Sequence, residues 1–136
     1  MIAVDTNVLV RLLLNDEPAQ VQQSKQLFAQ DEIFISDTVL LESAWVLKHA
    51  GGYTQPQIAE GLRRIGGFPS VSIESPKRLA LTWKWVHDGL DFADAFHLAD
   101  LQSFDHFVTF DQKFVKRTKR TQSNCEVIGI TKYQES

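Results

Sequence analysis

Short apolar runs alternate along this chain with longer stretches in which apolar residues recur every three or four positions. The short runs, rich in β-branched residues, predict strands at residues 2–4, 32–36, 71–73, 106–110 and 127–130. The longer stretches between them predict amphipathic helices. Strands that alternate with helices favour parallel pairing through right-handed crossovers. The expected fold class is therefore α/β, a three-layer α/β/α sandwich around a mostly parallel sheet.

Local signals place the ends of these helices. A helix is predicted at residues 6–14, and a second from Pro18 to about residue 31. Asp37 or Thr38 is expected to cap the third, which ends at the Gly51-Gly52 pair. The remaining predicted starts are a Thr54-x-x-Gln57 capping box, the Ser75-Pro76 pair, and Asp91 for a helix that reaches Phe104.

Composition narrows the function only slightly. A chain of 136 residues is most simply one domain spanning residues 1–136, with 43% hydrophobic residues as in ordinary globular proteins. The net charge of -3 provides no general attraction to nucleic acid, so any such contact depends on a local patch. The single cysteine, Cys125, fits a reducing compartment. Without a long apolar run or a signal peptide, we expect a cytoplasmic protein with no membrane association.

Five acids fall at comparable places on the predicted elements. Asp5 and Asp111 end the first and fourth strands, Glu42 lies early in the helix after the second strand, and Asp91 and Asp94 lie in the first turn of a later helix. The carboxyl ends of parallel strands face one edge of a sheet, which is where ligands bind in open α/β folds. The pattern therefore predicts that several carboxylates converge.

Converging carboxylates repel one another and need a partner. A helix N-terminus stabilises an exposed acid by only about 0.3–1 kcal/mol, too little for three or four like charges in contact. Carboxylates and water suit Mg²⁺ or Mn²⁺, and such an ion activates water and stabilises charge on a phosphodiester. The sequence thus predicts a metal site at this edge.

Taken singly, most of these acids also have a purely structural interpretation. Asp91 and Asp94 are spaced as a capping pair, and Asp111 could cap the helix that follows it. Glu42 could lie on a solvent face, although its apolar neighbours, Trp45 among them, leave little of one. Asp5 is the hardest to explain in this way, because it directly follows a buried strand.

Four stretches carry a family resemblance, in order and over nearly the whole chain: Val4-Asp5-Thr6-Asn7, the isolated Glu42, Asp91 to Ala95, and Val108 to Phe114. Together they resemble PIN-domain ribonucleases, and most closely the VapC-type toxins of toxin–antitoxin pairs. The resemblance implies a single PIN-like nuclease domain. It also implies metal-binding, catalytic roles for four acids: Asp5, Glu42, Asp94 and Asp111.

The resemblance implies further roles. Asp94 is favoured over Asp91 as the third acid because it begins a run of small and apolar residues, as in the family, which leaves Asp91 to cap the helix or support the metal. Asn7 and Thr109 match small polar positions that orient ligands or water. The implied reaction is metal-assisted hydrolysis of RNA that leaves 5′-phosphate and 3′-hydroxyl ends. The implied partners are a small antitoxin and a second copy of the chain.

One dense basic stretch follows Asp111. Lys113, Lys116 and Arg117 are its candidates for contact with the RNA backbone, although a run of charge is as often a solvated face. His97, one turn after Asp94, is expected to be packed or solvent-facing, since hard cations prefer oxygen.

The sequence is also compatible with three different functions. A haloacid-dehalogenase-like phosphatase also begins with an apolar strand ending in Asp, but it requires a second acid where this chain has Asn7. A housekeeping RNA-processing nuclease would carry the same acids without any toxin role. An inactive α/β interaction module would use the acids only as helix caps.

Overall fold

The computed structural model describes residues 1–135 and divides the chain into two compact units, Met1–Lys77 and Arg78–Ser136. Each unit combines parallel strands with helices, as the alternating pattern predicted. The expectation of a single domain over residues 1–136 stays a prediction.

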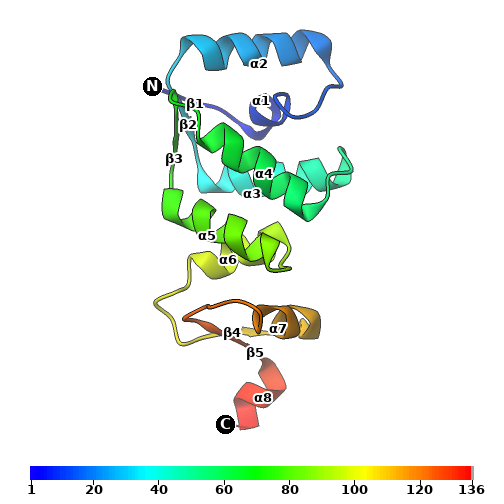
Figure 1. The fold of residues 1–136 in the computed structure, drawn as a ribbon, viewed down its shortest axis with the longest axis vertical. Helices are drawn as coiled ribbons and strands as arrows, with labels where there is room; N and C mark the ends of the chain where they lie inside the picture. Colours follow the sequence, from blue (N-terminus) through cyan, green and yellow to red (C-terminus); the bar gives the residue numbers. More distant parts are fainter. Residues whose placement is uncertain (136) are drawn as a thin grey trace. The chain divides into compact units, whose positions relative to one another are not determined.

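The first unit contains a three-stranded parallel sheet and four helices (Figure 1). The strands β1, β2 and β3 lie in that order, with Ile2 opposite Ile33 and Ile33 opposite Val71. The bounds in this unit are β1 Ile2–Ala3, α1 Thr6–Val10, α2 Pro18–Gln30, β2 Ile33–Ile35, α3 Asp37–His49, α4 Gln55–Gly66 and β3 Val71–Ile73.

The central strand and one face of each neighbouring helix supply the core of this unit. Ile33 and Ile35 of β2 are fully buried, because they point to the covered face of a strand paired on both sides. Leu9 of α1 and Leu47 of α3 are fully buried, and α1 packs on α3. On α4 the buried residues fall at helical spacing, from Ile58 through Leu62 to Ile65.

Capping side chains fix where α3 and α4 begin. Thr54 and Gln57 form the predicted capping box at the start of α4. The expected cap of α3 was wrong: Ser36 is the N-cap and accepts from the backbone N–H of Val39, because its extended backbone sits one residue before the first turn.

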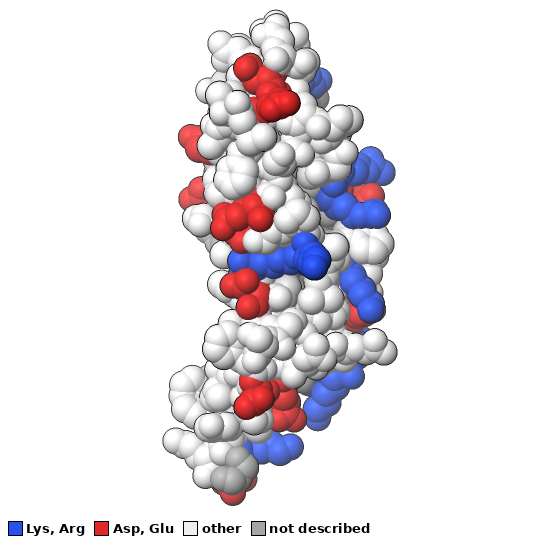
Figure 2. Space-filling model, turned by 90° about the vertical axis from the view of Figure 1, so that its left-hand side faces the viewer, with Lys and Arg blue, Asp and Glu red and all other residues white. Residues whose placement is uncertain are grey.

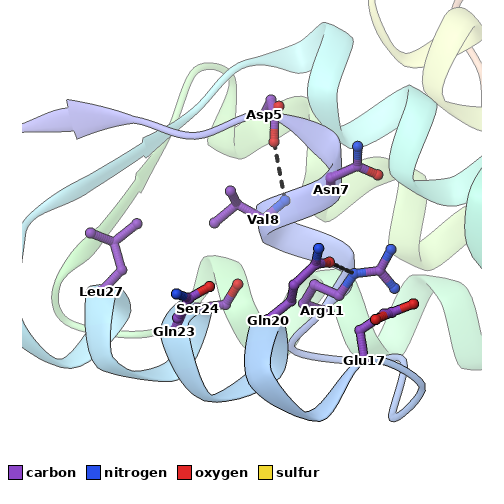
Figure 3. Close-up of a pocket in the computed structure, with 9 residues that line it drawn as sticks. All are labelled: Asp5, Asn7, Val8, Arg11, Glu17, Gln20, Gln23, Ser24 and Leu27. Atoms are coloured by element: carbon purple, nitrogen blue, oxygen red, sulfur yellow. Dashed lines mark hydrogen bonds between the residues drawn. The ribbon is translucent and has the colours of Figure 1, made fainter.

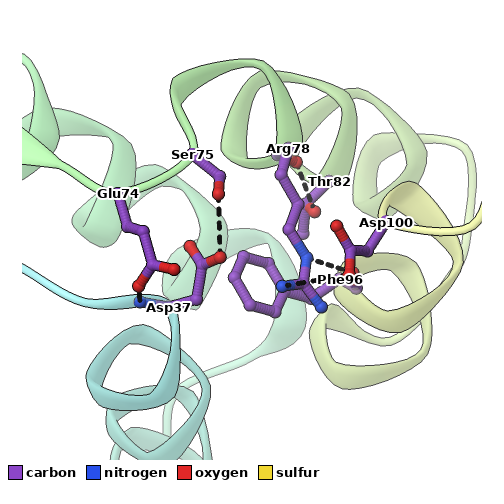
Figure 4. A network of polar contacts seen from close by, with 7 residues as sticks. All are labelled: Asp37, Glu74, Ser75, Arg78, Thr82, Phe96 and Asp100. Atoms are coloured by element: carbon purple, nitrogen blue, oxygen red, sulfur yellow. Dashed lines mark hydrogen bonds and ion pairs between the residues drawn. The ribbon is translucent and has the colours of Figure 1, made fainter.

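Asp37, the residue that follows that cap, ties α3 to the end of β3 (Figure 4). Its backbone N–H donates to Glu74 Oε1 at 3.0 Å, and its carboxylate accepts from Ser75 Oγ at 2.8 Å. These bonds hold the N-terminus of α3 and so fix the direction of the helix that carries Glu42.

The second unit contains a two-stranded parallel sheet in which His106 pairs with Glu126 and Thr109 with Gly129. Its core includes Trp85, Phe92 and Phe96, each at most 1% exposed. The bounds are α5 Pro76–His87, which begins two residues before the unit does, α6 Phe92–Ala99, β4 His106–Thr109, α7 Gln112–Thr118, β5 Glu126–Gly129 and α8 Ile130–Glu135.

Arg78 joins α5 to α6 within this unit (Figure 4). Its Nε donates to the carbonyl of Phe96 at 2.8 Å, and its guanidinium lies 3.8 Å from the centre of the Phe96 ring. Asp100 pairs with the same guanidinium at 3.9 Å. These contacts fix α6, the helix on which Asp94 lies.

The strands match their predicted positions, whereas two helices are shorter than predicted. Instead of reaching residue 14, α1 ends at Val10, and instead of reaching Phe104, α6 ends at Ala99. In both cases the chain continues in tight turns, where Leu12 bonds back to Leu9 and Leu101 to Leu98. The helix α8 was not predicted, because the last strand was extended into Ile130.

The burial of the tryptophans differs from what their helical spacing predicts. Trp85 is a core residue as expected, but Trp45 is 64% exposed. Both Lys and Arg side chains and Asp and Glu side chains are visible on the face shown in Figure 2. Among the described residues, no helix is long and apolar enough to cross a membrane.

Candidate functional site

Asp5 lies at the turn between β1 and α1. Val4 before it is buried, and the extended backbone of Asp5 makes it the N-cap of α1. Its carboxylate accepts from the backbone N–H of Val8 at 3.1 Å and remains exposed to solvent. The turn therefore presents a negative charge at a helix N-terminus, where the peptide dipoles favour it.

Glu42 is held against the same turn by one hydrogen bond. The hydroxyl of Thr6, which is buried, donates to Glu42 Oε1. Because Thr6 is the first residue of α1, this bond places the carboxyl group of Glu42 beside the turn that carries Asp5. Two of the four predicted acids thus come together in the first unit.

The surroundings of Glu42 differ from the expectation that little solvent face is left there. Glu42 is exposed, and so is Trp45 one turn later. The buried face of α3 is instead formed by Leu40, Ser43 and Leu47. Glu42 therefore keeps a solvent-accessible carboxylate while one of its oxygens accepts from Thr6.

Asp111 repeats the geometry of Asp5 in the second unit. It follows β4, has extended backbone, and accepts from the backbone N–H of Phe114 at 3.0 Å as the N-cap of α7. The hydroxyl of Thr109 accepts from the backbone N–H of Asp111 at 3.0 Å. Thr109 thus orders the turn that presents Asp111. Its predicted role in orienting ligands or water stays a prediction.

Asp91 and Asp94 do not form the capping pair that their spacing indicated. Asp91 occupies the N-cap position of α6, but its side chain makes no capping hydrogen bond. One of its oxygens instead lies 3.7 Å from a guanidinium nitrogen of Arg117. Asp94, in the first turn of α6, is half-buried.

Burial and neighbouring acids raise the pKa of Asp94. Desolvation is the largest cause, and the negative charges of Asp91 and Asp111 add to it. His97 and Arg117 act in the opposite direction and lower the same pKa. Three of the predicted acids are therefore close enough in the second unit for their charges to repel.

The basic residues of α7 are placed next to these acids. Lys113, Lys116 and Arg117 are all exposed. Arg117 faces the acids through its ion pair with Asp91, whereas the two lysines have no ion pair within residues 1–135. Arg117 therefore offsets the negative charge of the acids, whereas Lys113 and Lys116 remain available to an anionic ligand.

A cleft opens beside Asp5 between α1 and α2 (Figure 3). It has a volume of about 630 Å³ and extends from Asp5 and Asn7 along α1 toward the polar face of α2. Asn7, predicted to orient ligands or water, is exposed there. The α2 residues of this cleft were not predicted, and the only sequence signal for them is a run of glutamines at positions 20, 22, 23, 26 and 30.

The four predicted metal ligands are divided between the two units, with Asp5 and Glu42 in the first and Asp94 and Asp111 in the second. Their donor atoms are carboxylate oxygens, which fit a hard cation such as Mg²⁺ or Mn²⁺ rather than a soft one. Within residues 1–135, no group of three or more His, Cys, Asp or Glu residues is arranged so that it could hold a metal ion. The four-acid ligand set stays a prediction.

Comparison with known proteins identifies a family. Residues 2–120 match the family model described as the PIN domain. Comparison with curated proteins gives no match. The family match and the parallel strands confirm the expected α/β fold class with a PIN-like α/β/α sandwich.

Replacing Asp94 by Asn is expected to stabilise the protein near neutral pH in the presence of chelator. The raised pKa means that the folded state binds the Asp94 proton more tightly than the unfolded state, so the charge costs stability once the pH exceeds the folded pKa. The melting temperature of Asp94→Asn should exceed that of wild type by a few degrees at pH 7. The difference should disappear below pH about 3.8, the ordinary pKa of an Asp side chain, because the side chain at position 94 is then neutral in both proteins.

Glu135→Gln, an exposed change in α8, is the control and should produce no such pH-dependent gain. A destabilised Asp94→Asn variant at pH 7 would show that the charge of Asp94 is favourable in the folded protein, contrary to this account.

Proposed function

Because the chain belongs to the PIN-domain family, we propose that it is a divalent-metal-dependent endoribonuclease that hydrolyses RNA phosphodiester bonds. PIN domains are generally metal-dependent nucleases, so activity on nucleic acid follows from the family. One observation in the fold carries the proposal: two strand-to-helix turns each present an exposed carboxylate, Asp5 and Asp111, with a further acid placed close to each.

The proposed metal ligands and catalytic acids are Asp5, Glu42, Asp94 and Asp111. A bound Mg²⁺ or Mn²⁺ would polarise the scissile phosphate and supply hydroxide at neutral pH. The protein's own part is to hold these carboxylates ionised and in place. Capping bonds orient Asp5 and Asp111, Thr6 orients Glu42, and Arg117 lowers the pKa of Asp94 toward the charged form that a metal requires.

Three residues would support these acids. Thr109 orders the turn of Asp111, and Asp91 positions Arg117 through their ion pair. Asn7 lies two residues after Asp5 at the mouth of the cleft, where its amide could orient water or a ligand. Lys113, Lys116 and Arg117 are proposed to contact the RNA backbone.

We further propose that the nuclease is the toxin of a toxin–antitoxin pair, cytoplasmic and dimeric, with a housekeeping RNA-processing nuclease as the alternative. An apolar groove of about 570 Å³, whose lining includes Leu13, Phe28 and Phe68, supports docking of a small protein partner. The exposed Trp45 on α3 supports a dimer face. Growth arrest on expression, relieved by the product of an adjacent short reading frame, is expected for a toxin and not for a housekeeping enzyme.

Asp5→Asn is expected to abolish RNA cleavage while leaving the fold intact. Asn caps a helix about as well as Asp, so the bond to the Val8 N–H is kept and only the charge is lost. The rate of cleavage of a labelled RNA should fall at least a hundredfold. The free energy of unfolding, measured by thermal denaturation, should stay within about 0.5 kcal/mol of the wild-type value. Wild-type cleavage should also stop in excess chelator. Undiminished cutting by the variant, or cutting in chelator, would rule out this mechanism.

Lys116→Ala is expected to weaken RNA binding and to flatten its salt dependence. One phosphate contact to a single strand changes the slope of log K against log salt by roughly 0.7. Binding measured with the Asp5→Asn protein at several salt concentrations isolates this effect from cleavage. Lys48→Ala, which removes an exposed lysine from the last turn of α3, is the matched control and should leave the slope unchanged. Equal slopes for both variants would refute the contact.

A further inference from the structure

The cleft between α1 and α2 contains side chains that the proposed metal site does not use. Its volume of about 630 Å³ lies within the range of small-ligand sites, roughly 300–1,000 Å³. Figure 3 shows that it starts at Asp5 and continues between Val8 on α1 and the facing side of α2.

Arg11 fixes the orientation of Gln20 in this cleft. The Arg11 Nε donates to Gln20 Oε1 at 3.0 Å, and Arg11 Nη1 pairs with Asp16 at 2.6 Å. A guanidinium carries only donors, so the oxygen of the Gln20 amide must face Arg11. The amide nitrogen then points away from Arg11 and presents two donors that have no acceptor within residues 1–135.

The other lining residues indicate what these donors would meet. Val8 and Leu27 are apolar, and Gln23 and Ser24 are polar but uncharged. Apolar side chains combined with amide and hydroxyl groups suit a flat ligand with apolar faces and a polar edge, which describes a nucleobase. A phosphate fits poorly inside, because Asp5 and Glu17 repel it and the charge of Arg11 is already paired.

We infer that this cleft binds one nucleobase of the RNA substrate and that Gln20 is its specificity-determining residue. The inference rests on the proposed function, since a base held in the cleft would place its adjoining phosphate next to Asp5, one of the proposed metal ligands. A fixed donor favours a base with a keto oxygen, such as guanine O6 or uracil O4. It disfavours the amino groups of adenine and cytosine at the same edge.

Gln20→Glu tests the inference because it keeps the acceptor for Arg11 and replaces the donor by an acceptor. Sequencing the ends produced from an RNA library of random sequence should show, for wild type, a preference for G or U at one position next to the cut. One hydrogen bond to a base edge discriminates by about 1–3 kcal/mol, or roughly 5- to 150-fold. In Gln20→Glu the preference should shift to A or C, and in Gln20→Met it should disappear.

Gln26→Glu is the matched control. It adds the same charge to the same helix at an exposed position outside the cleft, so it should cut with the wild-type preference. Unchanged base preference in Gln20→Glu, or no preference in the wild type at any position near the cut, would overturn the inference.

A binding experiment separates failure of the inference from failure of the proposed function. In the Asp5→Asn protein, GMP and UMP should shift the Gln20 side-chain amide resonance in NMR at several-fold lower concentration than AMP and CMP. This result would support the base site even if the wild type did not cut RNA. If a cationic peptide such as triarginine shifts the cleft resonances and none of the four nucleotides does, the cleft binds protein and the inference is wrong.

Discussion

The proposed site depends on carboxylates that are also helix caps. Asp5 and Asp111 each follow a parallel strand and accept from a backbone N–H three residues later. Such a cap contributes about 0.5–2 kcal/mol to stability, and Asn provides it as well as Asp does. Folding therefore explains the side-chain oxygen at these positions but does not require a charge. We propose that the charge serves a bound ligand, because carboxylate oxygens suit a hard divalent cation.

Like charges in the second unit have to be balanced by the protein when no cation does so. Burial and two neighbouring acids raise the pKa of Asp94, while Arg117 and His97 lower it. Arg117 also pairs with Asp91. Arg117 thus has one role in keeping the acids ionised and a second, proposed role in contacting RNA. A cation bound at these acids would reduce the need for Arg117 to keep them ionised. The guanidinium of Arg117 would then be available for the phosphate backbone.

The sequence predicted the parts of the site that depend on local signals. Strand ends, parallel pairing and the positions of Asp5 and Asp111 follow from apolar runs and turn residues, and the structure agrees with them. The bond from Thr6 to Glu42 could not be predicted, because it joins residues 36 positions apart and requires α1 to pack on α3. The α1–α2 cleft escaped prediction for the same reason, since it is formed by two helix faces.

The periodicity of apolar residues also does not predict which apolar helix face is covered by another element. Trp45 and Trp85 both recur at helical spacing, yet one is 64% exposed and the other 1%. What decides burial is the element that packs against each face, which lies elsewhere in the sequence. Similarly, the spacing of Asp91 and Asp94 suits a capping pair, but the side chain of Asp91 makes no capping hydrogen bond and lies 3.7 Å from Arg117, a residue of another helix.

The most direct test of the central claim is calorimetric titration of the chelator-treated protein with Mn²⁺. If the capped carboxylates bind a divalent ion, wild type should give a saturable signal, and Asp5→Asn and Asp111→Asn should each weaken the affinity at least tenfold while unfolding as wild type does. The same affinity in all three proteins, or no binding by the wild type, would contradict the account.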